Sequence, residues 1–145
     1  MEKVLLALWL AGLEYGVSYE LLYSIAKTES GLHPYAVNIG GRSCYPETKE
    51  QALSLIRGKE NYDIGLMQIN SYWIRKFSLK PEWLFDPFYS ARWGAYILKY
   101  CQSKFGNTWR AVDCYHRGEK KASFYGKYSA KVCSILYGKE NCWTF

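Results

Sequence analysis

The sequence predicts a mainly α-helical single domain over residues 1–145, with a small β-hairpin around residues 35–46. Apolar residues in the longer runs recur at intervals of three and four, the period of a helix with one buried face. Capping residues and glycines stand where those runs begin and end. The hairpin is predicted from a Gly-Gly pair between two short extended pieces. A chain of 145 residues without repeats, low-complexity segments or a linker fits one domain.

Two helices are predicted at the N-terminal end of the chain. The first covers about residues 2–14 and ends near Gly16. Ser18 is a good N-cap for the second helix, which runs to Ser30 and ends at Gly31.

The middle of the chain is predicted to hold two shorter helices separated by a loop. Thr48 followed by Gln51 forms a capping-box pattern for a helix through "KEQALSLIRG". "NYDIGLMQIN", residues 61–70, is expected to be a loop because Gly65 interrupts any regular element. Ser71 then starts the second short helix.

Three helices are predicted in the C-terminal half. Asp86 caps the longest one, with Pro87 at its first position, and Gly106 ends it. Thr108 caps the next helix, and the last covers about residues 128–137.

The composition indicates a folded protein with a basic balance of charge. Hydrophobic residues make up 49% and charged residues 22%, which excludes a disordered chain. The net charge of +6 suits an acidic partner such as an anionic cell-wall polymer, a membrane surface or nucleic acid, and it fits an ordinary solvated surface at least as well. The chain has no long basic amphipathic helix and no nucleic-acid motif, so we expect neither nucleic-acid binding nor stable membrane insertion.

Five cysteines in a chain of this size favour an oxidising compartment. We expect Cys101 and Cys114 to pair, because they flank the "KFGNTW" turn between two helices that should run antiparallel. No metal or other cofactor is expected, since the chain lacks Cys-x-x-C spacing and its only histidines are His33 and His116. The N-terminal segment lacks a small-x-small cleavage site, so an export signal is expected to be missing from this chain.

Glu29 is the candidate catalytic acid. It shares a helical face with Leu22 and Ile25, in the last turn of the second predicted helix. Burial on that face and the negative end of the helix dipole both raise the pKa of a carboxyl group. A carboxylic acid that stays protonated near neutral pH is what general acid catalysis needs. The alternative is a glutamate whose stem packs while its head group reaches solvent.

Three motifs carry a resemblance to a known family. "ESG" at residues 29–31, "GLMQIN" at residues 65–70 and "AVDCYHRG" at residues 111–118 resemble motifs of the soluble, goose-lysozyme-like lytic transglycosylases. The likeness covers nearly the whole chain and is closest to the small enzymes of type III and type IV secretion, conjugation and pilus systems. It implies a lysozyme-like α+β fold and a location in the periplasm or cell envelope.

The same resemblance implies an activity. The family cleaves the MurNAc-β-1,4-GlcNAc bond of peptidoglycan glycan strands and leaves 1,6-anhydro-MurNAc ends. In secretion-linked members this opens the wall locally for a secretion, conjugation or pilus apparatus, whose components are then expected partners. Two alternatives remain open: a lysozyme-type hydrolase on the same scaffold, and a non-catalytic glycan-binding assembly protein.

Family roles can be carried over to matching positions of this sequence. Glu29 matches the catalytic glutamate. Met67 and Gln68 match cleft residues that contact sugar, and Gly65 permits a close backbone approach. Tyr115 matches a tyrosine that lies against the acid and can orient its carboxyl group.

The third motif departs from the family pattern. The family commonly has Ala-Tyr-Asn-x-Gly, whereas this chain has His116 in place of the asparagine. His116 can replace it as a hydrogen-bond donor to glycan and is weakly placed as a base. The alternative is a polar residue of the cleft or surface.

The sequence offers two candidates for a second carboxylate, which ordinary glycosidases need and lytic transglycosylases do without. Glu47 follows the predicted hairpin, where animal-type lysozymes place theirs. The alternative for Glu47 is an acid that favours the start of the following helix. Asp63, beside the second motif, is expected to order its loop rather than to take part in catalysis.

Overall fold

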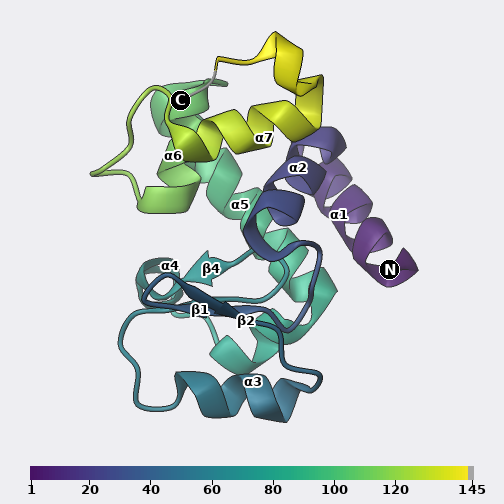
Figure 1. Ribbon diagram of the computed structural model, residues 1–145, viewed down its shortest axis with the longest axis vertical. Helices are drawn as coiled ribbons and strands as arrows, with labels where there is room; N and C mark the ends of the chain where they lie inside the picture. Colours follow the sequence, from purple (N-terminus) through teal and green to yellow (C-terminus); the bar gives the residue numbers. More distant parts are fainter. Residues whose placement is uncertain (144–145) are drawn as a thin grey trace.

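The computed structural model describes residues 1–143 and confirms the mainly helical, lysozyme-like fold with a small antiparallel sheet. Figure 1 shows α1, α2, α6 and α7 gathered around one end of α5, with the sheet, α3 and α4 at the other end. The helices are α1 (Glu2–Tyr15), α2 (Tyr19–Ser30), α3 (Lys49–Ile56), α4 (Ser71–Lys76), α5 (Pro87–Phe105), α6 (Trp109–Arg117) and α7 (Lys127–Tyr137), with short 3-10 helices η1 (Pro81–Phe85) and η2 (Lys139–Asn141).

The predicted helix caps are confirmed. Gly16 and Gly31 follow α1 and α2 in the left-handed conformation, with φ of 66° and 64°. The capping box before α3 is complete, because each of its two side chains bonds to the other residue's backbone. The side chains that accept a hydrogen bond from a first-turn backbone N–H are those of Ser18, Thr48, Asn70, Asp86 and Thr108.

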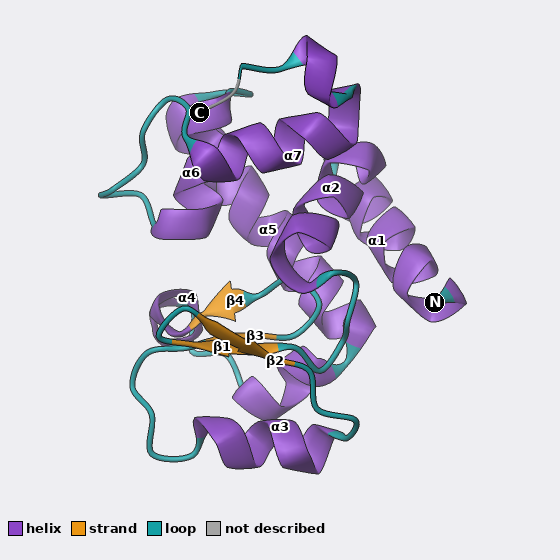
Figure 2. Ribbon diagram, viewed as in Figure 1, coloured by secondary structure: helices purple, strands orange, loops and turns teal. Residues whose placement is uncertain are grey.

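The sheet is larger than the predicted hairpin. The hairpin itself is confirmed as β1 (Val37–Ile39) and β2 (Arg42–Cys44). The expectation of an irregular loop over residues 61–70 is wrong, because β3 (Asp63–Ile64) and β4 (Ile69–Asn70) lie within it. All pairs are antiparallel in the order β2-β1-β3-β4, as Figure 2 shows in orange.

Gly65 makes the turn between β3 and β4 and does not interrupt them. Its φ of 82° lies in the region that favours glycine, and an added Cβ would collide with the carbonyl oxygen of Leu84. Gln68 closes the same turn with a φ of 47°. Each strand beside this turn has only two residues, so periodicity in the sequence could not reveal them.

The core lies where α5 meets α1, α2 and the sheet. Ile97 and Leu98 of α5 are fully buried. The predicted Cys101–Cys114 disulfide is confirmed and ties α5 to α6. A second disulfide joins Cys133 to Cys142, and Cys44 is free. Among the described residues, no helix is long and apolar enough to cross a membrane.

Candidate active site

Glu29 lies in the last turn of α2. Only 10% of its side chain is exposed, so its carboxyl is not a solvated surface group. Burial raises the pKa of Glu29, as predicted, and the nearby charge of Asp63 acts in the same direction. The hydrogen bond and charge of His116 oppose this rise without cancelling it. The environment of Glu29 therefore favours the protonated form more than water does.

His116 is the direct partner of Glu29. It lies in the last turn of α6, and its Nδ1 is 3.4 Å from Glu29 Oε2. Its ring stacks on Tyr128 of α7, with ring centroids 4.0 Å apart and planes 6° from parallel. Burial lowers the pKa of His116, but the net shift is upward. The rise comes from the hydrogen bond and charge of Glu29 and from the charges of Asp63 and Asp113. The imidazole is thus fixed against the acid from one side.

Tyr128 is a site residue that the sequence did not reveal. Its hydroxyl is buried and has no hydrogen-bond partner of ordinary geometry among the described residues. Burial and the neighbouring charge of Glu29 raise the pKa of Tyr128 well above its usual value. It belongs to no motif and lies close to the acid only because α7 packs on α2, so no local pattern could have marked it.

Tyr115 braces the backbone beside the acid rather than the carboxyl group itself. Its hydroxyl donates to the carbonyl oxygen of Met67 at 2.5 Å. The Ser30 hydroxyl donates to the carbonyl oxygen of Leu66 at 2.6 Å. The β3–β4 turn is therefore held from α6 by a tyrosine and from α2 by the residue next to Glu29. This joins the three sequence motifs into one structure.

Met67, Gln68 and Gly65 do not fit their expected role as sugar contacts. Met67 is fully buried and packs against Gly94 of α5, so its side chain cannot reach a glycan in this conformation. Gln68 is 6% exposed, and its Nε2 donates to the carbonyl oxygens of Ala36 and Gly65, both at 2.9 Å. The close approach that Gly65 permits is to the chain at Leu84, described above. These residues shape the turn that lies beside the acid.

The structure places the two candidate second carboxylates differently. Glu47 is exposed before α3, where its backbone N–H donates to Gln51 Oε1 at 3.0 Å, and no contact joins it to Glu29 among the described residues. Asp63 is half-buried, and Asn70 donates to its Oδ1 at 2.9 Å. Burial raises the pKa of Asp63, and its charge acts on Glu29. Asp63 therefore belongs to the electrostatic surroundings of the acid.

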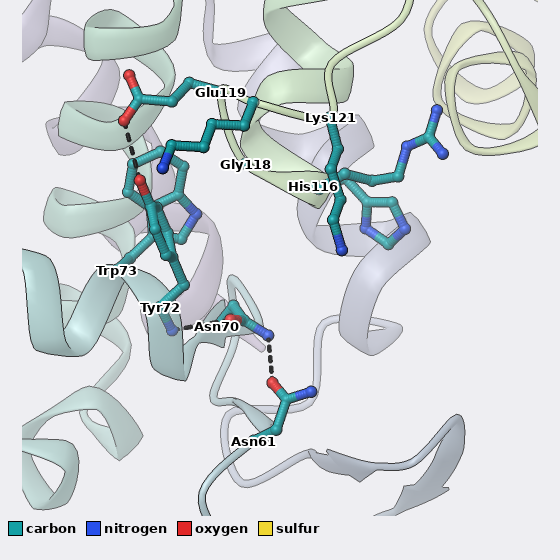
Figure 3. A pocket seen from close by; sticks show the side chains of 10 residues that line it. Asn61, Asn70, Tyr72, Trp73, His116, Gly118, Glu119 and Lys121 are labelled. Carbon is teal, nitrogen blue, oxygen red and sulfur yellow. Dashed lines mark hydrogen bonds between the residues drawn. The ribbon is translucent and has the colours of Figure 1, made fainter.

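A pocket of about 280 Å³ opens beside His116. Figure 3 shows Asn61 and Asn70 on one side of it and Glu119 and Lys121, from the loop after α6, on the other. Within residues 1–143 no group of three or more His, Cys, Asp or Glu side chains is arranged to hold a metal ion.

Comparison with known families gives the arrangement its context. A family model described as "Transglycosylase SLT domain" matches residues 9–135, which is most of the chain and includes Glu29, the β3–β4 turn and His116. The chain belongs to the SLT transglycosylase family.

Curated relatives of the chain include a type IV secretion system protein and an invasion protein. The chain is 27% identical to the type IV secretion system protein VirB1 of Brucella abortus over 136 residues, which cover 83% of this chain and 56% of VirB1. It is 30% identical to the invasion protein IagB of Salmonella typhimurium over 124 residues, 81% of this chain and 67% of IagB. It is 32% identical to the X polypeptide of Escherichia coli over 132 residues, 88% of this chain and 68% of that protein.

The chain spans little more than half the length of the VirB1 relatives that it matches. No solved structure matched it significantly. In this chain His116 contacts Glu29 and stacks on the ring of Tyr128.

Proposed function

We propose that this chain is a peptidoglycan lytic transglycosylase that cleaves the MurNAc-β-1,4-GlcNAc bond and leaves 1,6-anhydro-MurNAc ends. The observation that carries the proposal is Glu29, a buried carboxyl with a raised pKa, set where the motifs of an SLT transglycosylase domain meet. A protonated carboxyl at this position can act as a general acid at neutral pH.

The reaction needs one carboxyl group used twice. Glu29 donates its proton to the bridging oxygen as the C1–O bond breaks, and the substrate's acetamido group stabilises the positive charge at C1. The ionised Glu29 then accepts the proton of the muramic 6-hydroxyl while O6 closes on C1. Glu29 thus ends the cycle protonated again, its first proton has left on the released hydroxyl, and no water is consumed. His116, 3.4 Å away, favours the ionised form between the two steps.

The surroundings of Glu29 support the one-carboxyl scheme over a hydrolase that pairs Glu29 with Glu47. Glu47 is exposed and tied to the start of α3, which suits its alternative role at the helix terminus. Asp63 accepts a hydrogen bond from Asn70, and its charge favours the protonated form of Glu29. We therefore propose Glu29 as the catalytic residue and Asp63 as a group that tunes it.

The biological setting is proposed from the relatives. VirB1 is named as a type IV secretion system protein and IagB as an invasion protein. By similarity, we propose local opening of the cell wall for a secretion, conjugation or pilus apparatus, in the periplasm or cell envelope. The two disulfides suit that compartment, and the charge of +6 suits a wall rich in carboxylates.

Product analysis tests the proposal. Purified peptidoglycan is digested with the wild-type protein and with Glu29→Gln, and the released fragments are weighed by mass spectrometry. Anhydro ends, one water lighter than reducing ends, are expected from the wild type and none from Glu29→Gln. Reducing ends would identify a hydrolase. Equal wall clearance by both proteins would remove Glu29 from the mechanism, and no clearance by either would favour an assembly protein.

A further inference from the structure

The pocket beside His116 has no role in the proposed chemistry, yet it adjoins the acid through that residue. His116 contributes to its wall, and the Nδ1 of the same ring contacts Glu29. Asn61 lies on the opposite side; its Oδ1 accepts hydrogen bonds from Ser71 and Asn70, and no described residue accepts one from its amide N–H groups. Figure 3 shows Lys121 running alongside His116 toward the side where Asn61 lies.

The acidic residue in this pocket, Glu119, is ionised, and its charge is already balanced by neighbouring side chains. Tyr72 and Tyr100 donate their hydroxyl protons to Glu119 at 2.9 and 2.7 Å, and Lys76 and Lys104 lie 3.4 and 3.2 Å from it. Although burial opposes it, these partners lower the pKa of Glu119 to about 2. In Figure 3 its carboxylate turns toward Tyr72. Glu119 therefore anchors its loop and does not neutralise the lysines that follow it.

Two lysines on the same loop, Lys120 and Lys121, form no ion pair among the described residues. Arg117 is committed to Asp113 and to the Ser123 hydroxyl, at 3.2 and 2.8 Å. The Ser123 N–H also donates to Asp113 at 2.7 Å, which fixes the far side of the loop. Lys120 and Lys121, between these two anchors, are exposed and form no ion pair within residues 1–143. The loop thus holds two unpaired ammonium groups at the mouth of a polar pocket.

We propose that this pocket is a subsite for a carboxylate carried by the side chain of the muramic acid residue next to the cleaved bond. Lys120 and Lys121 bind the charge, and the Asn61 amide adds a neutral hydrogen bond. The assignment follows from position, because His116 lines this pocket and also contacts Glu29, the proposed catalytic acid. Muramic acid is the sugar of the glycan repeat that bears an acidic substituent, as either a lactyl group or a stem peptide. This inference rests on the proposed function.

Three forms of the same glycan strands distinguish the sources of the carboxylate. The first carries intact stem peptides. The second carries stems whose carboxylates have been capped as amides, which keeps their size and removes their charge. The third has been stripped by an amidase, so that only lactyl carboxylates remain. Initial rates give KM and kcat for the wild type, for Lys120→Gln/Lys121→Gln, and for a matched control, Lys3→Gln/Lys131→Gln, whose lysines are exposed on α1 and α7.

Lys120 and Lys121 would each make a partly exposed contact with the substrate carboxylate. We therefore expect a KM about fivefold lower for the preferred carboxylate form than for the amide-capped strands, with little change in kcat. The Lys120→Gln/Lys121→Gln variant should lose this preference, and the control should keep it. Preference for intact stems assigns the stem peptide, and preference for stripped strands assigns the lactyl group. Equal KM values on all three forms, or a preference that survives in the double variant, would overturn the subsite while cleavage itself stands. Absence of cleavage by the wild type would overturn the proposed function and the subsite together.

Discussion

Glu29 shows how one residue acquires a function from its surroundings. Burial disfavours its charged form, and Asp63 adds a second negative charge nearby, so its pKa is raised. His116 acts against both effects at 3.4 Å. A group balanced in this way can give up its proton and recover it within one catalytic cycle.

The raised pKa of Glu29 fixes the direction of the pH dependence. The general acid works only when protonated, so activity should be present below this pKa and fall as pH rises through it. The basic limb of the kcat profile is therefore expected above the value of an ordinary glutamate. Initial rates on soluble glycan strands across the pH range measure it. A limb at the pH of a free carboxyl would contradict the assignment.

Replacement of the buried carboxyl should also change stability with pH. Folding raises the pKa of Glu29, so at intermediate pH the folded chain binds more protons than the unfolded chain. The protonated group therefore contributes fully to the free energy of unfolding below the unfolded pKa, and this contribution is lost as pH rises through the folded pKa. Glu29→Gln should therefore be more stable than the wild type at pH 8 and not at pH 4. Urea unfolding at both pH values tests this. An equal difference at both would indicate a packing effect.

His116→Asn restores the residue that the family commonly has at this position. It removes a positive charge next to Glu29, so the pKa of Glu29 should rise further and the basic limb should move to higher pH. The 3.4 Å contact makes this shift of the limb measurable. The variant keeps a polar side chain of similar reach, so loss of fold is not expected. An unchanged limb would mean that the imidazole only fills space above Tyr128.

At the scale of elements, the β3–β4 turn is the part that connects the motifs. Ser30 and Tyr115 each give a hydroxyl proton to a carbonyl oxygen of this turn. Both hydroxyls are buried, so removing either leaves an unpaired acceptor and should cost about 1–3 kcal/mol. Ser30→Ala and Tyr115→Phe are compared by urea unfolding with Ser54→Ala, whose hydroxyl bonds its own helix at the surface. Similar losses in all three would show that the turn is not specially held.

The same turn marks the limit of prediction from the sequence. Helix ends at Ser18, Thr48 and Asp86 were predictable because capping depends on residues within one turn of each other. The Cys101–Cys114 disulfide was predictable because a short turn brings its two helices together. The burial of Met67 and the position of Tyr128 depend on packing between distant segments, which no local pattern records.

At the scale of the whole molecule, the charge of +6 should act on encounter with the wall and leave the chemistry unchanged. Raising ionic strength from about 0.05 to 0.5 M shortens the Debye length to a few ångströms and screens this attraction. Clearance of intact, anionic peptidoglycan should therefore slow several-fold over this range, through KM. The kcat on short soluble glycan fragments should stay nearly constant, because the Glu29 side chain is only 10% exposed and therefore weakly screened. A parallel fall of both would show that salt perturbs the site itself, and clearance independent of salt would show that the surface charge does not guide the protein to its substrate.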